Sequence, residues 1–364
     1  MKQFKCNRFQ LIALTVFLLT LNSSVTECNA QSSVHPYLLA LSKKDHTLAV
    51  VDASSLKIMA RIPVGEDPHE VIASSDGKLA YVSIYGGGSL HEIDVIDLVA
   101  NRALPAIDTK PFFGPHGLTF AAGKLWFTAE GSKSVVRYDP AKNAFDWAMG
   151  TGQNRTHMIY VTPNAKRVYT TNVSSGTVSI LTDTLIQPGG FGPRPGASAP
   201  PAGGPPPGFR PQPHSDWIQT LIPVSTGSEG FDVSPDGKQL WTVAADDGTI
   251  AVIDLESKKA TDKINAKVLG ANRLEFTPDG RQVLISSLRN GDIVVYDVAS
   301  HKEVKKINIG HGAAGILMDP DGSRAFVGCT ADDYVAVIDL KTLEVTGHIN
   351  VGGGPDGLAW VARQ

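Results

Sequence analysis

The sequence predicts an all-β fold, a seven-bladed β-propeller, and two observations support this prediction. First, one motif recurs at intervals of about forty residues, which is typical of propellers and other repeat proteins. Second, each repeat contains short segments of alternating apolar and polar residues separated by Gly, Pro and Asp turns, as expected of antiparallel strands. Such repeats are stable when they close into a ring, because a ring leaves few open sheet edges.

The repeat over residues 227–267 shows how one blade is built. Its four strands are expected at 231–233, 239–244, 250–255 and 260–264. Between the first two strands, Ser234–Gly237 reads Ser-Pro-Asp-Gly. Proline sets φ to about −65° at the second turn position, and glycine accepts a positive φ at the end of the turn. This segment is therefore predicted to be a tight turn between two antiparallel strands.

The two ends of the chain complete the repeat pattern. Six complete repeats are expected at 66–110, 111–152, 153–226, 227–267, 268–310 and 311–352. Residues 37–64 have the pattern of three outer strands without an innermost strand, whereas Gly354–Trp360 has the pattern of an innermost strand alone. We therefore expect the C-terminal strand to join the N-terminal strands in a seventh blade, which closes the ring.

Residues 1–30 have the pattern of a secretory signal peptide. Basic residues precede the apolar segment Leu11–Leu21, and a small-residue cleavage site ends at Ala30. The apolar segment is too short to span a bilayer comfortably. We therefore expect a secreted or periplasmic protein with no membrane span after cleavage and a mature propeller domain over residues 31–364. That domain contains a single cysteine, Cys329, so it forms no internal disulfide.

The third repeat is interrupted by a Pro- and Gly-rich insert at residues 183–215. Such a composition does not favour strand pairing, and it predicts a disordered loop between the third and fourth strands of that blade. Because successive strands alternate in direction, this loop is expected on the opposite face from the loops that enter the innermost strands.

The composition argues against a nucleic-acid partner. The formal net charge is −3, and charged residues make up 19% of the chain. The sequence has no basic run that would follow a phosphate backbone. We expect a monomer that binds a small polar molecule or a metal.

Aligning the repeats on Pro115-His116-Gly117 brings seven residues to one position at the start of the innermost strand. They are His69, His116, His157, Glu229, Asn272, Ala314 and Asp356. Because the innermost strands surround the channel, we expect these residues to form a ring at one channel mouth. The three histidines come from consecutive blades, and three adjacent imidazoles suit Zn, Cu or Fe with an open position for chemistry. Glu229 or Asp356 would then act as a catalytic acid or base.

Two other interpretations of this ring are open. A polar ring can bind a ligand without a metal, and a histidine in the Pro-His-Gly segment can simply cap a turn. The expected ligand-binding residues are Asn272, Arg155, Arg273, Tyr85 and Glu130, in the ring, beside it or in loops that face the same way. An arginine can hold a carboxylate or a phosphate through paired hydrogen bonds.

The repeat resembles that of the YVTN-type β-propeller proteins, which include surface-layer and periplasmic propellers. Tyr169–Asn172 followed by Gly176–Ile180 is close to the signature, and Ser234–Lys238 and Ile309-Gly310 match other parts of it. The resemblance implies the propeller fold over nearly all of the mature chain, but no single activity. The repeat is also similar to the propeller domains of haem d1 and copper enzymes. The sequence has no Cys-x-x-Cys-His motif and no appended copper domain, so neither cofactor follows.

Three functions are therefore open. The first is metal-dependent lyase or hydrolase activity on a small polar substrate, with His69, His116 and His157 as metal ligands and Glu229 or Asp356 as the acid or base. The second is a propeller that binds a ligand or a protein without turnover. The third is a copper redox protein that uses the same histidines. Apart from a Zn, Cu or Fe ion, no cofactor is expected.

Overall fold

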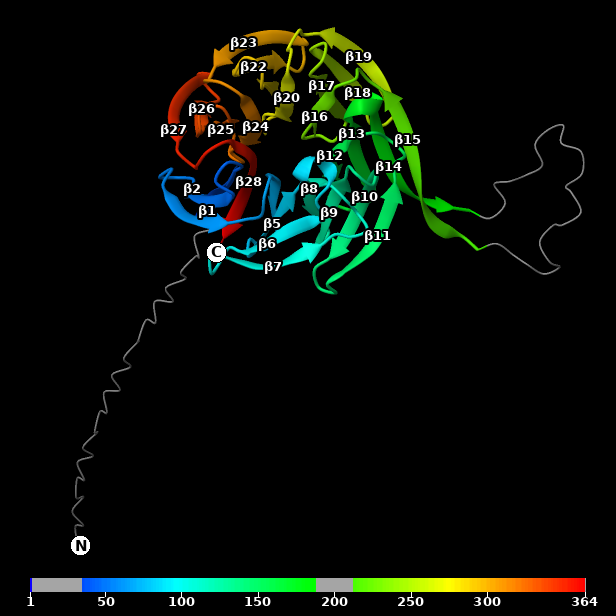
Figure 1. Cartoon of the computed structure of the whole chain (residues 1–364), viewed down its shortest axis with the longest axis horizontal. Coiled ribbons are helices and arrows are strands. Elements are labelled where there is room, and N and C mark those ends of the chain that lie inside the picture. The colour runs from blue at the N-terminus through cyan, green and yellow to red at the C-terminus, as the bar shows by residue number, and fades with distance from the viewer. Residues whose placement is uncertain (2–34, 188–211, 364) are drawn as a thin grey trace, which may run out of the picture. The chain divides into compact units, whose positions relative to one another are not determined.

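The computed structural model describes Met1, residues 35–187 and residues 212–363. The predicted signal peptide, residues 1–30, lies outside these residues apart from Met1. The described residues from 35 onward form seven four-stranded antiparallel sheets arranged in a ring around a central axis (Figure 1). The predicted seven-bladed propeller is therefore confirmed.

Six blades follow the chain in order, and in each the first strand lies nearest the channel. The first blade comprises β4 (Pro68–Ala73), β5 (Leu79–Ile84), β6 (Glu92–Asp97) and β7 (Arg102–Asp108). The second comprises β8 (Pro115–Ala121), β9 (Lys124–Ala129), β10 (Ser134–Asp139) and β11 (Ala144–Gly150). The third comprises β12 (Thr156–Val161), β13 (Arg167–Asn172), β14 (Thr177–Ile186) and β15 (His214–Pro223). The fourth comprises β16 (Ser228–Val233), β17 (Gln239–Ala244), β18 (Thr249–Asp254) and β19 (Lys259–Asn265). The fifth comprises β20 (Ala271–Phe276), β21 (Gln282–Ser287), β22 (Asp292–Asp297) and β23 (Lys302–Asn308). The sixth comprises β24 (Ala313–Met318), β25 (Arg324–Cys329), β26 (Tyr334–Asp339) and β27 (Glu344–Ile349).

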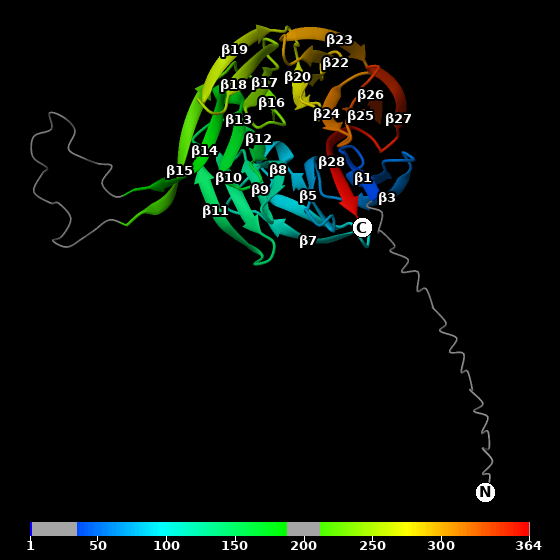
Figure 2. The same cartoon turned by 180° about the vertical axis from the view of Figure 1, so that it is seen from behind.

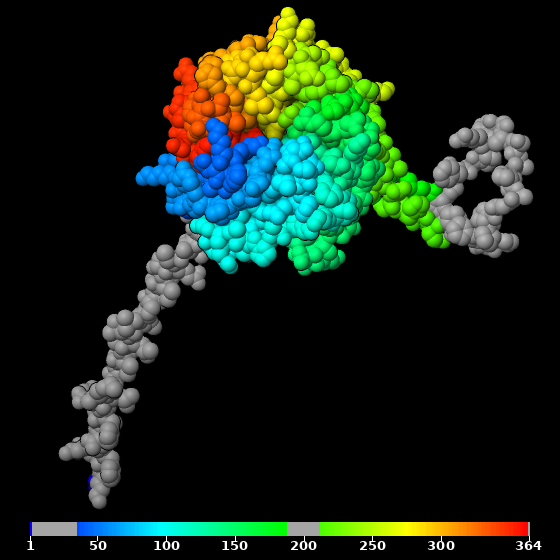
Figure 3. Space-filling view, in the orientation of Figure 1, coloured from blue at the N-terminus to red at the C-terminus, as the bar shows by residue number. Residues whose placement is uncertain are grey.

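The seventh blade joins the two ends of the described chain. β28 (Pro355–Arg363) pairs antiparallel with β1 (His35–Ser42), and β2 (Thr47–Asp52) and β3 (Ile58–Pro63) complete the sheet. The C-terminal strand, in red, lies against the N-terminal strands, in blue, in the ribbon seen from behind and in the space-filling view (Figures 2 and 3). The expected ring closure is therefore confirmed.

The hydrophobic core is divided among the interfaces between neighbouring blades. Among the described residues there are seven clusters of buried hydrophobic side chains, and each cluster joins two adjacent blades. Strand alternation explains this division, because successive side chains of one strand point to opposite faces. Leu38 of β1 packs in a cluster with Phe326 of the sixth blade. Its neighbour Leu39 packs in a cluster with Val71 of the first blade.

The outer hairpin of the third blade is longer than the sequence indicates. β14 and β15 pair as far as Ile186 and His214, so the two ends of the 183–215 segment are paired strand rather than loop. Residues 188–211 of the predicted insert lie outside the described residues.

Helical structure is confined to two short 3-10 turns within the described ranges, η1 (Gly86–Gly88) and η2 (Val173–Ser175). Within the part of the chain that the structure describes, no helix combines the length and the hydropathy needed to span a membrane.

Candidate functional site

A β-bulge places the ring residues at the channel mouth. In all seven innermost strands, the pairing register shifts around the second and third residues of the strand. In β12, for example, His157 and Met158 lie between the paired residues Thr156 and Ile159 and oppose Thr171 alone. A bulge of this kind bends the strand and changes the direction of its side chains. The ring residue is therefore the second residue of each innermost strand, inside the sheet rather than in the preceding turn.

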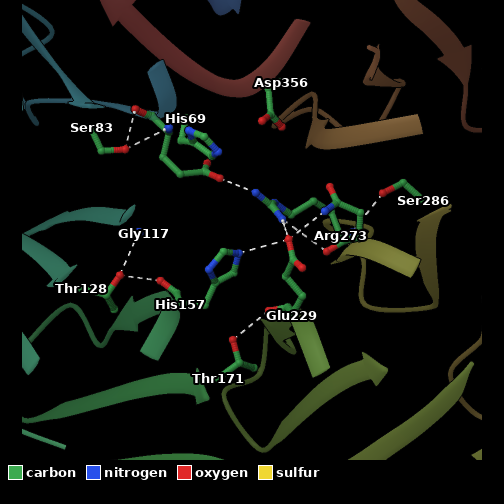
Figure 4. Close-up of polar contacts among 12 residues, drawn as sticks. His69, Ser83, Gly117, Thr128, His157, Thr171, Glu229, Arg273, Ser286 and Asp356 are labelled. Carbon is green, nitrogen blue, oxygen red and sulfur yellow. Dashed lines mark hydrogen bonds and ion pairs between the residues drawn. The ribbon is translucent and has the colours of Figure 1, made fainter. Parts of the chain in front are cut away.

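Hydroxyl side chains from the second strands satisfy the backbone at three of these bulges. Ser83 accepts a hydrogen bond from the backbone N–H of Glu70 at 3.0 Å. Thr128 accepts one from Gly117 at 2.9 Å, and Ser286 accepts one from Arg273 at 3.0 Å (Figure 4). Because a buried backbone N–H needs a partner, these hydroxyls hold the bulges in place.

The residue after the ring position is glycine in four of the seven innermost strands, namely Gly117, Gly230, Gly315 and Gly357. At each of them, a Cβ atom would collide with the backbone of the next innermost strand. Close approach of the strands around the channel therefore requires glycine there. Only Glu70, Met158 and Arg273 carry side chains at this position.

All seven ring residues line one cavity of about 350 Å³ at the channel mouth. The other residues that line it are Lys43, Lys44, Tyr85, Arg155, Arg273, Leu288, Thr330 and Gly354. The structure therefore brings together the ring and every other predicted ligand-binding residue except Glu130, which lies immediately behind and contacts Tyr85 and His157. A larger groove of about 690 Å³ lies elsewhere, between turns of the fourth and fifth blades, and is lined by residues such as Pro235 and Ala299.

Glu229 is the centre of the polar network behind the cavity. Its Oε1 atom accepts hydrogen bonds from Asn272 Nδ2 at 2.8 Å and from Arg273 Nη1 at 3.2 Å. The same oxygen lies 3.1 Å from His157 Nε2, so that Glu229 lies between His157 and Arg273 (Figure 4). Burial opposes ionisation, but the surrounding cations hold the pKa of Glu229 far below its usual range. Glu229 is therefore a permanent carboxylate.

His157 is held between two carboxylates. Its Nδ1 atom pairs with Glu130 Oε1, and its Nε2 atom pairs with Glu229 Oε1. A carboxylate only accepts hydrogen bonds, so Nδ1 of His157 carries a proton, whereas the contact of Nε2 with Glu229 is an ion pair without hydrogen-bond geometry. Burial disfavours the charged ring, but the two carboxylates outweigh it and raise the pKa of His157. His157 is thus a buried imidazolium.

Arg273 reaches across the channel. It extends from β20 and pairs through Nη2 with Glu70 of β4, which belongs to a blade three positions further around the ring. Burial disfavours its charge, yet Glu70 and Glu229 raise the pKa of Arg273. The guanidinium is therefore paired with two carboxylates, and its role in holding a ligand stays a prediction.

His116 has the opposite surroundings to its neighbour His157. Its ring centroid lies 3.7 Å from that of His157, 4.9 Å from Tyr85 and 5.0 Å from His69. Burial, followed by the positive charge of His157, lowers the pKa of His116 well below its usual value. Its Nδ1 atom is buried and has no hydrogen-bond partner among the described residues. His116 is therefore a neutral imidazole at the cavity wall.

Glu130 holds Tyr85 at the cavity wall. The Tyr85 hydroxyl donates a hydrogen bond to Glu130 Oε2, while the other oxygen of Glu130 takes His157. Burial and the neighbouring carboxylate raise the pKa of Tyr85, so its hydroxyl stays protonated. Burial opposes the charge of Glu130, but contact with His157 lowers its pKa.

Arg155 is the most exposed of the predicted charged site residues. The Arg155 side chain is 44% exposed, and its nearest carboxylate oxygens, in Glu130 and Glu229, lie 3.6 and 3.9 Å away. These distances are too long for hydrogen bonds. Asp356 faces Lys43 at 3.4 Å.

Lys43 and Glu70 are site residues that sequence reasoning missed. Lys43 lies between β1 and β2, and its Nζ donates to His69 Nε2 at 2.7 Å. The sequence contained a signal for Lys43, because β1 and β2 are the second and third strands of the closing blade. The equivalent loops of two other blades contain the predicted residues Tyr85 and Glu130. Glu70 occupies the position that is glycine in four other innermost strands. This departure from the repeat was a signal in the sequence that could have identified Glu70 as a site residue.

The three histidines lie side by side, but their nitrogens do not converge on one point. Both nitrogens of His157 contact carboxylates, and Nε2 of His69 accepts from Lys43. Within residues 35–187 and 212–363, no three His, Cys, Asp or Glu side chains are placed so as to hold a metal ion. This arrangement does not fit a three-histidine metal centre, and the metal site at His69, His116 and His157 stays a prediction.

Comparison with protein families gives a partial match. The model of the cytochrome D1 heme domain matches residues 212–323, which is less than a third of the chain. This segment contains Glu229, Asn272 and Arg273 but none of the three ring histidines. No curated protein matches the chain.

Solved structures share the fold at low sequence identity. A functionally unknown protein from Desulfotomaculum acetoxidans is 11% identical, with a TM-score of 0.69 over 90% of this chain and 99% of its own. Hydrazine synthase from Kuenenia stuttgartiensis is 15% identical, with a TM-score of 0.63 over 80% of this chain and 89% of its own. The dihydro-heme d1 dehydrogenase NirN in complex with DHE is 14% identical, with a TM-score of 0.58 over 88% and 74%. These likenesses support the propeller fold, and the YVTN resemblance stays a prediction.

Proposed function

We propose that this chain is a ligand-binding propeller whose cavity at the channel mouth takes one small polar organic molecule. The observation that carries the proposal is a pair of atoms, His116 Nδ1 and Asn272 Oδ1, which are buried at this cavity with neither a hydrogen bond nor an ion-pair contact among the described residues. His157 Nε2 also lacks a hydrogen bond, but it lies 3.1 Å from the Glu229 carboxylate. Buried polar atoms nearly always have a hydrogen-bond partner, so a bound molecule is the simplest source of the missing ones. A volume of about 350 Å³ lies within the range of small-molecule sites.

The contacts favour binding over the acid–base role that the sequence suggests for Glu229. A general base works best with a pKa near the operating pH. Glu229 is far from that condition, because the surrounding cations depress its pKa. Asp356 is the remaining predicted acid or base, and its side chain is 14% exposed beside Lys43. Turnover by this site would therefore depend on Asp356 and not on Glu229.

A thermal-shift screen tests the proposal. The panel contains hydroxy acids, sugars, amino acids and organic phosphates, each added to the purified propeller. A ligand at about one hundred times its Kd stabilises the native state by about 2.7 kcal/mol, which raises Tm measurably. We expect at least one class to raise Tm and the His116→Phe variant to lose that shift.

The matched control is His301→Phe, because His301 lies in the separate groove between the fourth and fifth blades. This variant keeps the ligand-induced shift if the channel mouth is the site. A panel with no active compound, or an equal shift in the two variants, contradicts the proposal.

A tetrapyrrole is the second candidate ligand, favoured by the match to the cytochrome D1 heme domain. The cavity is at the small end of the range for ligand sites and does not fit a macrocycle as it stands. Titration with haem, followed by absorbance, separates the two candidates. Stoichiometric binding that is lost in His69→Ala and His116→Ala would replace the small-molecule proposal.

We also propose that the protein is exported and that cleavage follows Ala30, because residues 1–30 have the order of a signal peptide. N-terminal sequencing of the protein recovered from the periplasm or the medium tests this. A cytoplasmic product that keeps Met1 would contradict it.

A further inference from the structure

We propose that the ligand of this cavity is a small hydroxy acid, whose carboxylate binds Arg155 and whose hydroxyl binds Asn272 and His116. This inference rests on the proposed function and gives it a ligand class. Three features of the cavity carry it: the charge balance of its buried wall, the chemistry of its two unpartnered atoms, and the open guanidinium at its rim.

The buried charges of the wall already have partners. Arg273 pairs with Glu70 and Glu229, and His157 pairs with Glu130 and Glu229. A charged ligand group placed among them would have to displace one of these pairs, and breaking a buried pair is strongly unfavourable. The part of the ligand that reaches the buried wall is therefore uncharged.

The unpartnered atom of Asn272 needs a donor. Its Nδ2 atom faces the Glu229 carboxylate at 2.8 Å, and a carboxylate only accepts, so the orientation of the amide is determined. The remaining atom, Oδ1, is buried, unpartnered and able only to accept. A ligand hydroxyl or amide N–H satisfies it, whereas a carbonyl or an ether oxygen does not.

The unpartnered atom of His116 selects a hydroxyl among these donors. His116 is neutral, so its Nδ1 is either a donor or an acceptor according to the tautomer. A hydroxyl has one proton to donate and can accept others, so it can donate to Asn272 Oδ1 while it accepts a hydrogen bond from His116 in the tautomer that carries its proton on Nδ1. An ammonium group is excluded for the reason already given, because the charged groups of this wall are paired with one another and the part of the ligand that reaches them is uncharged.

The anionic end of the ligand belongs at Arg155. The guanidinium lines the same cavity, is 44% exposed at the side chain, and has its nearest acidic oxygens beyond hydrogen-bond distance. Its planar set of N–H donors matches the two oxygens of a carboxylate. Lys43 is less available, since it contacts His69, Asp67 and Asp356. A carboxylate at the rim and a hydroxyl at the buried wall together define a hydroxy acid.

Calorimetric titration of the mature propeller with matched pairs of acids tests the hydroxyl assignment. The pairs are lactate and propionate, malate and succinate, and citrate and tricarballylate, which differ within each pair by one hydroxyl. We expect the hydroxy acid of at least one pair to bind about three- to tenfold more tightly, the gain from one or two net hydrogen bonds. That preference needs no variant to be measured, so it does not depend on the folding of a mutant.

Variants then assign the two ends of the ligand. Asn272→Leu and His116→Phe should bring the affinity ratio within the pair close to one. Arg155→Met should weaken both acids by a similar factor and leave the ratio unchanged. Arg289→Met is the control, because Arg289 is exposed and does not line the cavity. Because His116 stays neutral, the ratio should not change from about pH 6 to about pH 8, the range in which an ordinary histidine titrates.

The outcomes separate this inference from the proposed function. If both members of every pair bind equally, or if only compounds without a carboxylate bind, the hydroxy-acid assignment is wrong and the ligand-binding function stands. If a hydroxy acid binds equally well to wild type and Arg155→Met, the assignment of the carboxylate is wrong. If no compound of the wider panel binds, the proposed function itself fails.

Discussion

The starts of β8 and β12 are the same position in two successive repeats, and each carries a histidine, yet the two rings have opposite protonation. His116 and His157 lie 3.7 Å apart between ring centroids, and both are almost completely buried. His157 has a carboxylate at each nitrogen, hydrogen-bonded at Nδ1 and in ion-pair contact at Nε2, whereas His116 has an imidazolium against its face and neither kind of contact at Nδ1. The difference shows that the neighbours of a histidine, rather than its place in the repeat, decide its charge.

The largest effect should come from replacing these two histidines in turn by phenylalanine. His157→Phe leaves Glu130 and Glu229 without their shared cation, and breaking a buried ion pair in this way costs about 3–5 kcal/mol of unfolding free energy. His116→Phe removes no hydrogen bond of Nδ1 and should cost about 1 kcal/mol or less. Urea denaturation of both variants measures the contrast, and equal losses would contradict the assigned charges.

The second-largest loss of unfolding free energy is expected for Glu229→Gln. The amide keeps the shape of the side chain but removes the charge that His157 and Arg273 share. We expect a loss of about 3 kcal/mol of unfolding free energy and a fall in the pKa of His157 towards that of His116. NMR titration of the histidine ring signals tests the second part. The control is Asp356→Asn, whose carboxylate contacts Lys43 and neither histidine.

The stability of the wild type should decline on both sides of a window between about pH 4.5 and about pH 6.5. The pKa of His157 is raised by folding, so its stabilisation is complete below the ordinary value of 6.5 and is lost as the pH rises through the higher folded value. The pKa of Glu229 is lowered by folding, so its stabilisation is complete above the ordinary value of 4.5 and is lost as the pH falls.

Urea denaturation at pH values below, within and above this window measures the decline in unfolding free energy on its acid and alkaline sides. The alkaline decline should be absent in His157→Phe and retained in His116→Phe. A decline of equal size in both variants would show that another group is responsible.

The smallest expected effect concerns the metal content of the purified protein. Because the three imidazoles do not present convergent nitrogens, protein purified without a histidine tag should hold well under one equivalent of Zn, Cu or Fe by elemental analysis. One full equivalent, lost when His69, His116 and His157 are all replaced, would restore the metalloprotein hypotheses. It would also mean that His157 leaves its two carboxylates when the metal binds.

Much of the architecture was predictable because its signals are local. The turn Ser234–Gly237 and the alternation of apolar residues predict strands, and the incomplete repeats at 37–64 and 354–360 predict the closing blade. The insert at 183–215 was less accurately delimited, because residues at its two ends, such as Ile186 and His214, pair as an extension of a hairpin that composition does not indicate. The bulges were also missed, because glycine marks the bulged position in only four of the seven innermost strands.

By itself, the sequence determined the blade repeat, the ring closure and the seven positions that meet at the channel mouth. A repeat of strands and turns is read from neighbouring residues, and ring symmetry then brings equivalent positions together. Only the tertiary structure decided that Arg273 is committed to Glu70, that Lys43 joins the site and that His157 is charged while His116 is neutral. Those contacts join residues from different blades, up to 203 positions apart in the chain. Their protonation depends on distances and burial that exist only once the ring has closed.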